Sequence, residues 1–298
     1  MRKSGATALI KGNLVLVESV NIVKTVKCEK KLKDTIRRYE EQYQAKFDDV
    51  IVFNDNVLDE IRGTVIAQRI RRKIIRGLKG QVNVLQDSRY DELVGLNLRS
   101  IAEIANSQSP DGLITKERYR HHFDYLRKYL LSKISDRINH NSICISPMRV
   151  GPFMLKEQDA ARMNVRVVYP QIKRIYTEEK RPIAVAIEKM RIDQLVNCKQ
   201  LVILDGGIVS GITIVGLLES LNKKGALPQN ILIGAVHANM YGILNIMRLA
   251  ERLSVKIDIY AIITSYAISE TLYAYYDCEP WKSGTLVTGD IGDYLATS

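Results

Sequence analysis

The sequence predicts an α/β fold in which a mostly parallel sheet is flanked by helices and preceded by a basic N-terminal α+β extension. Three observations predict it. From residue 142 onward, short apolar runs alternate with helical patterns, which is typical of parallel strands joined by crossover helices. One apolar run ends in an aspartate followed by glycines, as at the ligand-binding edge of such a sheet. The first 80 residues are instead basic, with 18 Lys and Arg against 10 Asp and Glu.

The parallel sheet is predicted from short apolar segments rich in Ile and Val. Helical patterns over residues 213–226 and 242–253 separate the last three of these segments. Ligands are expected at the carboxyl ends of the strands, where the connecting loops gather. The predicted strands are residues 142–146, 165–170, 184–188, 200–205, 231–238 and 256–264.

The N-terminal part mixes short strand patterns with charged helical patterns. We therefore predict a basic extension over residues 1–90 and a main domain over residues 91–298, which opens with a helical lead-in at 91–140. Strands are expected at 14–23 and 49–55, helices at 30–47 and 61–80, and mainly helix over 88–140.

Two basic features of these helices allow more than one interpretation. In residues 61–80, Arg71, Arg72 and Arg76 flank an apolar stripe, so this helix could bind phosphates, although a solvated surface helix is the favoured reading. His121 and His122 are adjacent, and adjacent helical positions point about 100° apart, so the pair is not expected to hold one metal ion. Tyr119, Phe123, Tyr125, Leu126 and Leu130 are predicted to be core residues.

Composition limits the class of protein. The chain has 298 residues, 46% of them hydrophobic, and a formal net charge of +11. No apolar run reaches the roughly 18 residues that a membrane span needs, and no export signal is visible at the N-terminus. The cysteines lack metal-type spacing, which favours reduced thiols in the cytoplasm. They are Cys28, Cys144, Cys198 and Cys278.

The segment LVILDGGIVSGIT, residues 201–213, carries the most specific signal. Glycines and hydroxyl side chains stand directly before a predicted helix, where free N–H groups and the helix dipole favour an anion. An acid at the end of the strand, Asp205, suits ribose hydroxyls or a metal beside that anion. Together these features fit a sugar phosphate, whereas the glycines alone also fit an ordinary strand-to-helix turn. Neither the G-x-x-x-x-G-K-[ST] nor the G-x-G-x-x-G spacing is present.

This segment resembles the phosphoribosyl-diphosphate (PRPP) loop of type I phosphoribosyltransferases. The most similar variant is that of the uracil phosphoribosyltransferases, which reads D-P-M-[LI]-A-[TS]-G-[GN]-[ST]. Asp205 matches the motif aspartate, Ser210 and Gly211 the hydroxyl–glycine pair, and Thr213 the final hydroxyl. The sequence departs from the motif at Gly206, Gly207 and Ile212.

Two further segments resemble the same family and follow in the expected order. PMRVGPFM, residues 147–154, is similar to P-I-L-R-A-G but one residue shorter, with Arg149 and Gly151 matched. GTLVTGDIGDYL, residues 284–295, resembles I-x-P-G-x-G-D-A-G-D-R, with Gly289 and Asp290 matched. The resemblance spans residues 142–298 and implies a type I phosphoribosyltransferase-like fold.

The resemblance also implies an activity and a site. The protein would transfer phosphoribose from PRPP to a nitrogen acceptor, would use Mg²⁺ held through substrate phosphates rather than by protein ligands alone, and would form a homo-oligomer. Asp205, Arg149 and Asp290 would be the catalytic residues. The PRPP-binding set would be Asp205, Gly206, Gly207, Ile208, Val209, Ser210, Gly211, Thr213, Arg149, Gly151 and Arg174.

The acceptor end departs most from the family. Leu286 and Val287 replace the usual Pro-Gly, Tyr294 replaces an arginine and Ser269 an aspartate, which argues against simple uracil specificity. The acceptor-binding set would be Leu286, Val287, Thr288, Gly289, Asp290 and His237. The alternative is a regulatory or effector protein of a bacterial system that uses the fold to sense a ligand. Its basic N-terminal region would then bind nucleic acid, a nucleoprotein or a protein partner.

Overall fold

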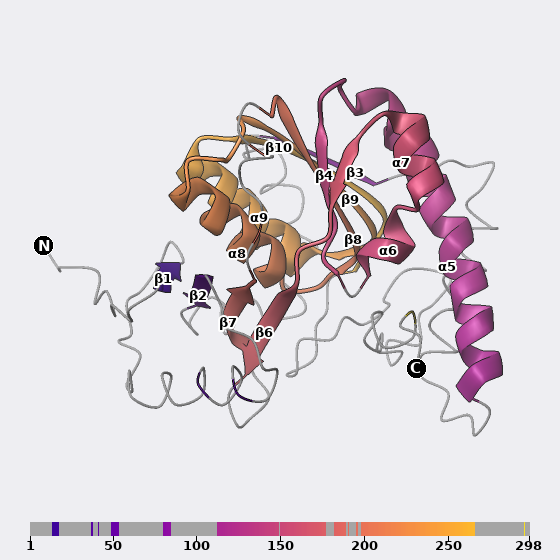
Figure 1. Cartoon of the computed structure of the whole chain (residues 1–298), viewed down its shortest axis with the longest axis horizontal. Helices are drawn as coiled ribbons and strands as arrows, with labels where there is room; N and C mark the ends of the chain where they lie inside the picture. Colours follow the sequence, from indigo (N-terminus) through magenta and orange to yellow (C-terminus); the bar gives the residue numbers. More distant parts are fainter. Residues whose placement is uncertain are drawn as a thin grey trace, which may run out of the picture.

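The computed structural model describes residues 14–17, 37, 41, 49–53, 80–84, 112–148, 150–176, 182–188, 190, 195, 198–265 and 295. Its described strands form two sheets (Figure 1). One has six strands in the order β3-β10-β9-β8-β4-β5, and the other has four strands in the order β1-β2-β7-β6.

The six-stranded sheet is parallel throughout its described pairings and contains five of the six predicted strands. Its central strands are continuous apolar runs, as expected where helices cover both faces of a parallel sheet. The mostly parallel sheet with flanking helices confirms the predicted fold class. Its strands are β3 (Gly80–Val84), β4 (Ile143–Ile145), β5 (Arg166–Val168), β8 (Gln200–Ile208), β9 (Asn230–Asn239) and β10 (Lys256–Ser265).

The four-stranded sheet joins an internal hairpin to two N-terminal strands. The hairpin consists of β6 (Ile172–Tyr176) and β7 (Pro182–Ile187), which pair antiparallel. β2 (Asp49–Phe53) pairs antiparallel with β7, and β1 (Leu14–Val17) pairs parallel with β2. The prediction that 184–188 joins the parallel sheet is therefore wrong, because this segment finds its partners in β6 and β2 instead.

The two faces of the six-stranded sheet carry separate hydrophobic cores. α8 (Ile212–Lys223) and α9 (Met240–Leu253) cover one face, and their apolar side chains pack on Ile203, Ile233 and Ile259. On the other face, α5 (Gly112–Ile134) packs against Leu204 and Leu232. Figure 1 shows the sheet between these layers. The shorter helices near α5 are α6 (Gly151–Met154) and α7 (Glu157–Met163), and a 3₁₀ turn at Ser135–Arg137 follows α5.

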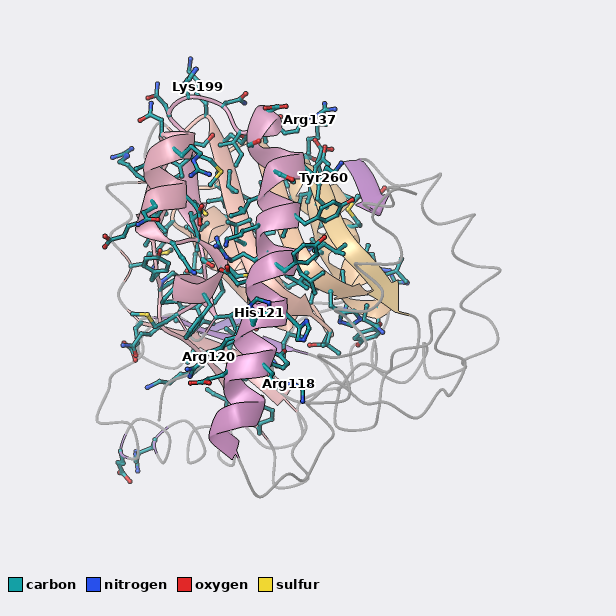
Figure 2. All side chains as sticks on the ribbon, turned by 90° about the vertical axis from the view of Figure 1, so that its right-hand side faces the viewer. Arg118, Arg120, His121, Arg137, Lys199 and Tyr260 are labelled. Carbon is teal, nitrogen blue, oxygen red and sulfur yellow. The ribbon has the colours of Figure 1, made fainter. Side chains whose placement is uncertain are left out.

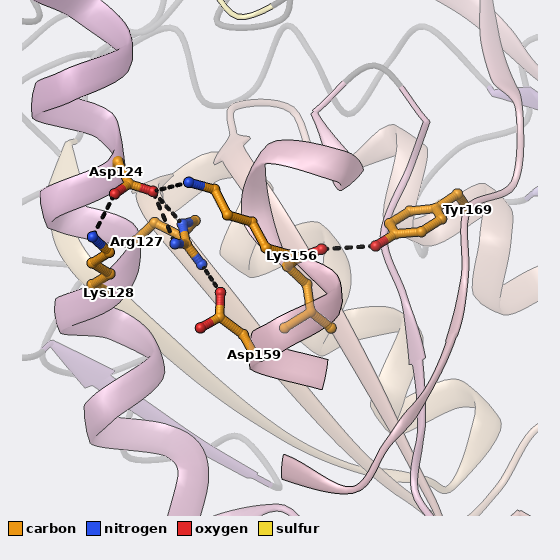
Figure 3. A network of polar contacts seen from close by, with 7 residues as sticks. Asp124, Arg127, Lys128, Lys156, Asp159 and Tyr169 are labelled. Atoms are coloured by element: carbon orange, nitrogen blue, oxygen red, sulfur yellow. Dashed lines mark hydrogen bonds and ion pairs between the residues drawn. The ribbon is translucent and has the colours of Figure 1, made fainter. Parts of the chain in front are cut away.

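A buried arginine ties α5 to α7 (Figure 3). Arg127, only 1% exposed, donates to Asp124 at 2.8 Å and also pairs with Asp159 of α7. Lys128 and Lys156 approach Asp124 at 2.8 and 2.9 Å. Burial alone would raise the pKa of Asp124, but hydrogen bonds from the two lysines and Arg127 outweigh it and hold this pKa well below its usual range.

The side chains of α5 divide as its sequence predicts. Tyr119, Phe123, Leu126 and Leu130 are buried, and Tyr125 packs partly buried against them. His121 is exposed, and Figure 2 shows it with Arg118 and Arg120 on α5. None of the helices that the structure describes is long and apolar enough to cross a lipid bilayer.

Candidate functional site

The strand order places a topological switch point between β4 and β8. From β4 the chain adds β5 on one side, whereas β8, β9 and β10 extend the sheet on the other. Ligands of open α/β sheets bind outside the carboxyl ends of the strands at such a point. The segments that follow β4 and end β8 are residues 147–154 and 205–213, two of the three segments on which the sequence prediction depends.

Asp205 lies near the carboxyl end of β8 and is 8% exposed. Its Oδ1 accepts a hydrogen bond from the Gly207 N–H at 3.3 Å. The strand continues past Asp205 to Ile208, because Gly207 and Ile208 pair with His237 and Ala238 of β9. The predicted loop is thus shorter than expected: Gly206 and Gly207 are strand residues, and the turn into α8 is residues 209–211.

The turn into α8 requires a glycine in the turn itself, Gly211, and another in α9, Gly242, because the two backbones approach closely. Gly211 is the N-cap residue of α8 and has a φ of 73°, in the left-handed region that favours glycine. A Cβ on Gly211 would lie 2.7 Å from the Gly242 carbonyl oxygen, and a Cβ on Gly242 would lie 2.6 Å from that of Val209. Asn245 Nδ2 donates to the Ser210 carbonyl oxygen at 2.9 Å. The first turns of α9 therefore fix the shape of the loop.

The hairpin brings a cation to the start of α8. Arg174 of β6 donates from Nε to Thr213 Oγ1 at 3.1 Å, although 39 residues separate the two in sequence. Ile212, where the family motif has a small residue, is buried in a cluster with Val185 and Ile187 of β7. The larger side chain at this position thus contacts the hairpin that carries Arg174.

The turn after β4 is also closely packed. Ser146 Oγ donates to the Leu204 carbonyl oxygen of β8 at 2.6 Å, and the Gly151 N–H donates to the Pro147 carbonyl oxygen at 2.6 Å. A Cβ on Gly151 would lie 2.5 Å from the Ser146 carbonyl oxygen, so the turn requires glycine there. Met148, 42% exposed, lies on this turn. Arg149 itself falls outside the described residues.

His237 lies in β9 opposite Gly207 of β8 and is 1% exposed. Burial lowers the pKa of its imidazole to about 4, so the ring is neutral at pH 7. Two residues later, Asn239 caps α9 by accepting a hydrogen bond from the Tyr241 N–H at 2.9 Å. A neutral histidine beside the turn can donate or accept a hydrogen bond but cannot neutralise a phosphate.

The structure thus gathers some predicted site residues and leaves others undescribed. It brings Arg174 to Thr213 and places Asp205, Ser210 and Gly211 in the strand end and turn that lead into the same helix. Among the parts of the chain that it describes, no three His, Cys, Asp or Glu side chains cluster as a metal site. The sequence-predicted residues outside those parts are Arg71, Arg72, Arg76, Arg149, Leu286, Val287, Thr288, Gly289 and Asp290.

Sequence reasoning missed Gly242 and Asn245, which shape the turn, and Ser146, which links β4 to β8. The signal for Gly242 was present, because a glycine in the first turn of a predicted helix marks a close backbone approach. Nothing in the local pattern marks Ser146 or Asn245, since each acts through a main-chain carbonyl group distant in sequence.

The sequence matches no protein-family model and no curated protein. Among solved structures, the chain is similar to the AQ2163 protein from Aquifex aeolicus, with 17% identity and a TM-score of 0.50, over 72% of this chain and 97% of that one. It is also similar to the adenine phosphoribosyltransferase from Thermoanaerobacter pseudethanolicus, with 17% identity and a TM-score of 0.34, over 51% and 86% of the two chains.

A third similar structure is the adenine phosphoribosyltransferase from Trypanosoma brucei, solved with AMP, pyrophosphate and ribose-5-phosphate. Its identity is 11% and its TM-score 0.36, over 55% of this chain and 79% of that one. The likeness to AQ2163 is one of fold. The structural neighbours thus include type I phosphoribosyltransferases at low identity, while the fold class follows from the strand order itself.

Proposed function

We propose that this protein is a phosphoribosyltransferase-like enzyme that binds PRPP and transfers its phosphoribose to a nitrogen acceptor. One observation carries the proposal: at the switch point between β4 and β8, a buried aspartate is followed by a glycine turn and by an uncapped helix start that contacts an arginine through Thr213. These are the groups that a phosphorylated sugar needs. The family resemblance of residues 147–154, 201–213 and 284–295 adds the identity of that sugar.

In the proposed reaction, the bond from ribose C1 to the pyrophosphate oxygen breaks and a bond from C1 to the acceptor nitrogen forms. Pyrophosphate leaves, and the proton of the acceptor nitrogen is released. Because the transition state is oxocarbenium-like, the chain contributes mainly by holding ribose and leaving group in place. Asp205 would bind ribose hydroxyls, and the turn ending at Gly211 would hold the 5′-phosphate together with Thr213.

The remaining assignments depend on the resemblance. Arg149 would neutralise pyrophosphate, Asp290 would lie near the acceptor, and His237 would offer the acceptor a neutral hydrogen-bonding group. Asp205 is suited to lie beside a Mg²⁺ ion, since Mg²⁺ prefers substrate phosphates with one or two carboxylates over an all-protein cage. When bound, Mg²⁺ would neutralise charge on the departing pyrophosphate.

Calorimetry with PRPP and Mg²⁺ tests the proposal directly. The unmodified protein is expected to bind PRPP, and Asp205→Ala is expected to abolish binding while the urea unfolding midpoint still reports a folded chain. Asp258→Ala is the matched control, because this carboxylate lies near the opposite end of the sheet and pairs with Lys256 at 3.6 Å. If the unmodified protein gives no heat with PRPP, the proposal is wrong.

The acceptor can be found by incubating the protein with PRPP and a panel of bases and nucleotides. Mass spectrometry would then detect a product heavier by one phosphoribosyl group, together with released pyrophosphate. Because of the changes at Leu286 and Val287, we expect an acceptor other than uracil alone. Efficient conversion of uracil and of nothing else in the panel would contradict this expectation.

A further inference from the structure

The register of the four-stranded sheet decides which way Arg174 points. Arg174 lies opposite Val185 in the antiparallel pair of β6 and β7, and paired residues share a face of the sheet. Val185 packs with Ile212 at the start of α8. A Cβ added to Gly216 of the same helix would lie 3.0 Å from the Cβ of Val185. Arg174 therefore lies on the α8 side of this sheet.

The neighbouring cation, Lys173, lies on the opposite face. It pairs with Ala186 in register, and its Nζ is 3.3 Å from a carboxylate oxygen of Glu188. The charge of Lys173 is thus compensated within the hairpin. Arg174 differs, because in the described part of the chain its guanidinium makes one hydrogen bond, from Nε to Thr213 Oγ1, and its Nη atoms have no carboxylate partner.

The contact between these side chains has a chemical consequence for Thr213. A hydroxyl has one proton and two lone pairs, so Thr213 Oγ1, which accepts from Arg174, keeps its own proton to donate. Accepting from a cation also polarises the O–H bond and strengthens it as a donor. Since Thr213 is only 9% exposed and lies in the first turn of α8, few orientations are open to it.

The start of α8 offers further donors. Its N-cap residue Gly211 has no side chain, and the first helical bond from this turn runs from the Val215 N–H to the Gly211 carbonyl at 2.9 Å. The N–H groups of Ile212, Thr213 and Ile214 consequently have no acceptor inside the helix. Ser210, 3% exposed, makes no side-chain hydrogen bond within the described residues, so its hydroxyl is a further polar group at this turn.

We propose that Arg174 is a positioning residue of this site, because it holds the Thr213 hydroxyl as a donor toward the 5′-phosphate that the proposed function assigns to the turn. We call the pair of Arg174 and Thr213 the clamp. The family resemblance places Arg174 in the PRPP-binding set without a particular role, and the contact with Thr213 gives it a role at the loop phosphate. That the ligand is a sugar phosphate rests on the proposed function. Ribose 5-phosphate carries this phosphate without pyrophosphate and is therefore the probe for the clamp.

Calorimetry of the full chain with ribose 5-phosphate, without Mg²⁺ or pyrophosphate, tests the clamp. Arg174→Gln and Thr213→Val should each weaken binding by about tenfold to a hundredfold, since hydrogen bonds to charged groups are lost. The double variant should lose less than the product of the two single effects, because the two side chains act together. Thr213→Ser keeps the hydroxyl and should restore binding to within about threefold of the unmodified protein.

Lys173→Gln is the matched control, because it removes the same charge from the adjacent residue on the opposite face. It should leave the affinity for ribose 5-phosphate within about twofold, since its partner is Glu188. Equal affinities for the unmodified protein, Arg174→Gln and Thr213→Val would overturn the clamp, and so would the absence of ribose 5-phosphate binding to the unmodified protein. Urea unfolding of each variant shows that the compared chains are folded.

The two proposals can fail separately. If ribose 5-phosphate binds with the expected pattern but PRPP is never consumed with any acceptor, the clamp is supported and the transferase proposal fails. If PRPP is consumed and neither Arg174→Gln nor Thr213→Val changes its affinity or that of ribose 5-phosphate, the clamp is wrong and the transferase proposal remains.

Discussion

Replacing Gly211 by alanine tests whether the turn into α8 is held by its contact with α9. Two costs are expected. Placing an alanine at a φ near +73° costs about 1–2 kcal/mol of stability, because the left-handed conformation is unfavourable for a residue with a Cβ. Its Cβ would also lie 2.7 Å from the Gly242 carbonyl oxygen, a backbone atom that cannot move alone, and relieving such overpacking costs about 1–3 kcal/mol. The free energy of unfolding should therefore fall by about 2–5 kcal/mol.

Gly225→Ala separates these two costs. Gly225 follows α8 and has a φ of 66°, and among the described residues no atom beyond its two chain neighbours lies within 4 Å of where a Cβ would be. This variant should lose only the conformational part, about 1–2 kcal/mol. The difference between the two variants then measures the contact between residue 211 and α9.

Urea unfolding followed by circular dichroism gives both free energies, provided that the m-values of the variants agree. Ribose 5-phosphate binding is the second readout: Gly211→Ala should weaken it, because the turn must move, whereas Gly225→Ala should not. If Gly211→Ala destabilises the protein no more than Gly225→Ala does and binds ribose 5-phosphate normally, the close packing of this turn on α9 does not shape the site.

Two further predictions concern stability. Arg127→Met should lower the free energy of unfolding by about 2–4 kcal/mol, because it leaves Asp159 without its buried partner, whereas Lys128→Met removes a 66% exposed partner of Asp124 and should cost less than about 1 kcal/mol; equal losses in urea unfolding would contradict this. His237 takes up a proton at about pH 4 when folded but near pH 6.5 when unfolded, so the unfolded state binds more protons in that window and stability should fall by up to about 3 kcal/mol as the pH drops through it. His237→Leu should remove this part of the pH dependence, and an unchanged slope of unfolding free energy between pH 4 and 6.5 would refute the assignment.

The sequence was sufficient to predict the parallel sheet and the helices between its last strands. Continuous apolar runs such as residues 200–205 and 231–238 are long enough to form buried strands, and the intervening helical periods leave a parallel arrangement as the favoured one. β8, β9, β10, α8 and α9 agree with those predictions to within a few residues at their ends. The aspartate near the carboxyl end of β8 and the glycine before α8 were recognisable because both features are local, but the end of the strand was placed three residues too early.

The sequence could not decide which sheet the segment at 184–188 joins. Its residues are apolar on both faces of the strand, so the pattern fits a central parallel strand as well as a strand packed against α8. The sheet that this segment joins depends on its partner strands. β6 and β2 pair with its two edges, and β2 lies more than 100 residues away in the chain. Among the described strands, β3 likewise joins the main sheet through β10 alone.

The sequence by itself therefore determined the class of fold, an acid near the carboxyl end of a strand and a glycine turn into the next helix, because each follows from residue spacing within one segment. Only the tertiary structure decided that β8 runs on to Ile208, that Gly242 faces Gly211 and that Arg174 meets Thr213. These contacts join residues about 30 or more positions apart, and their geometry is set by strand register and helix packing. No local pattern encodes that geometry.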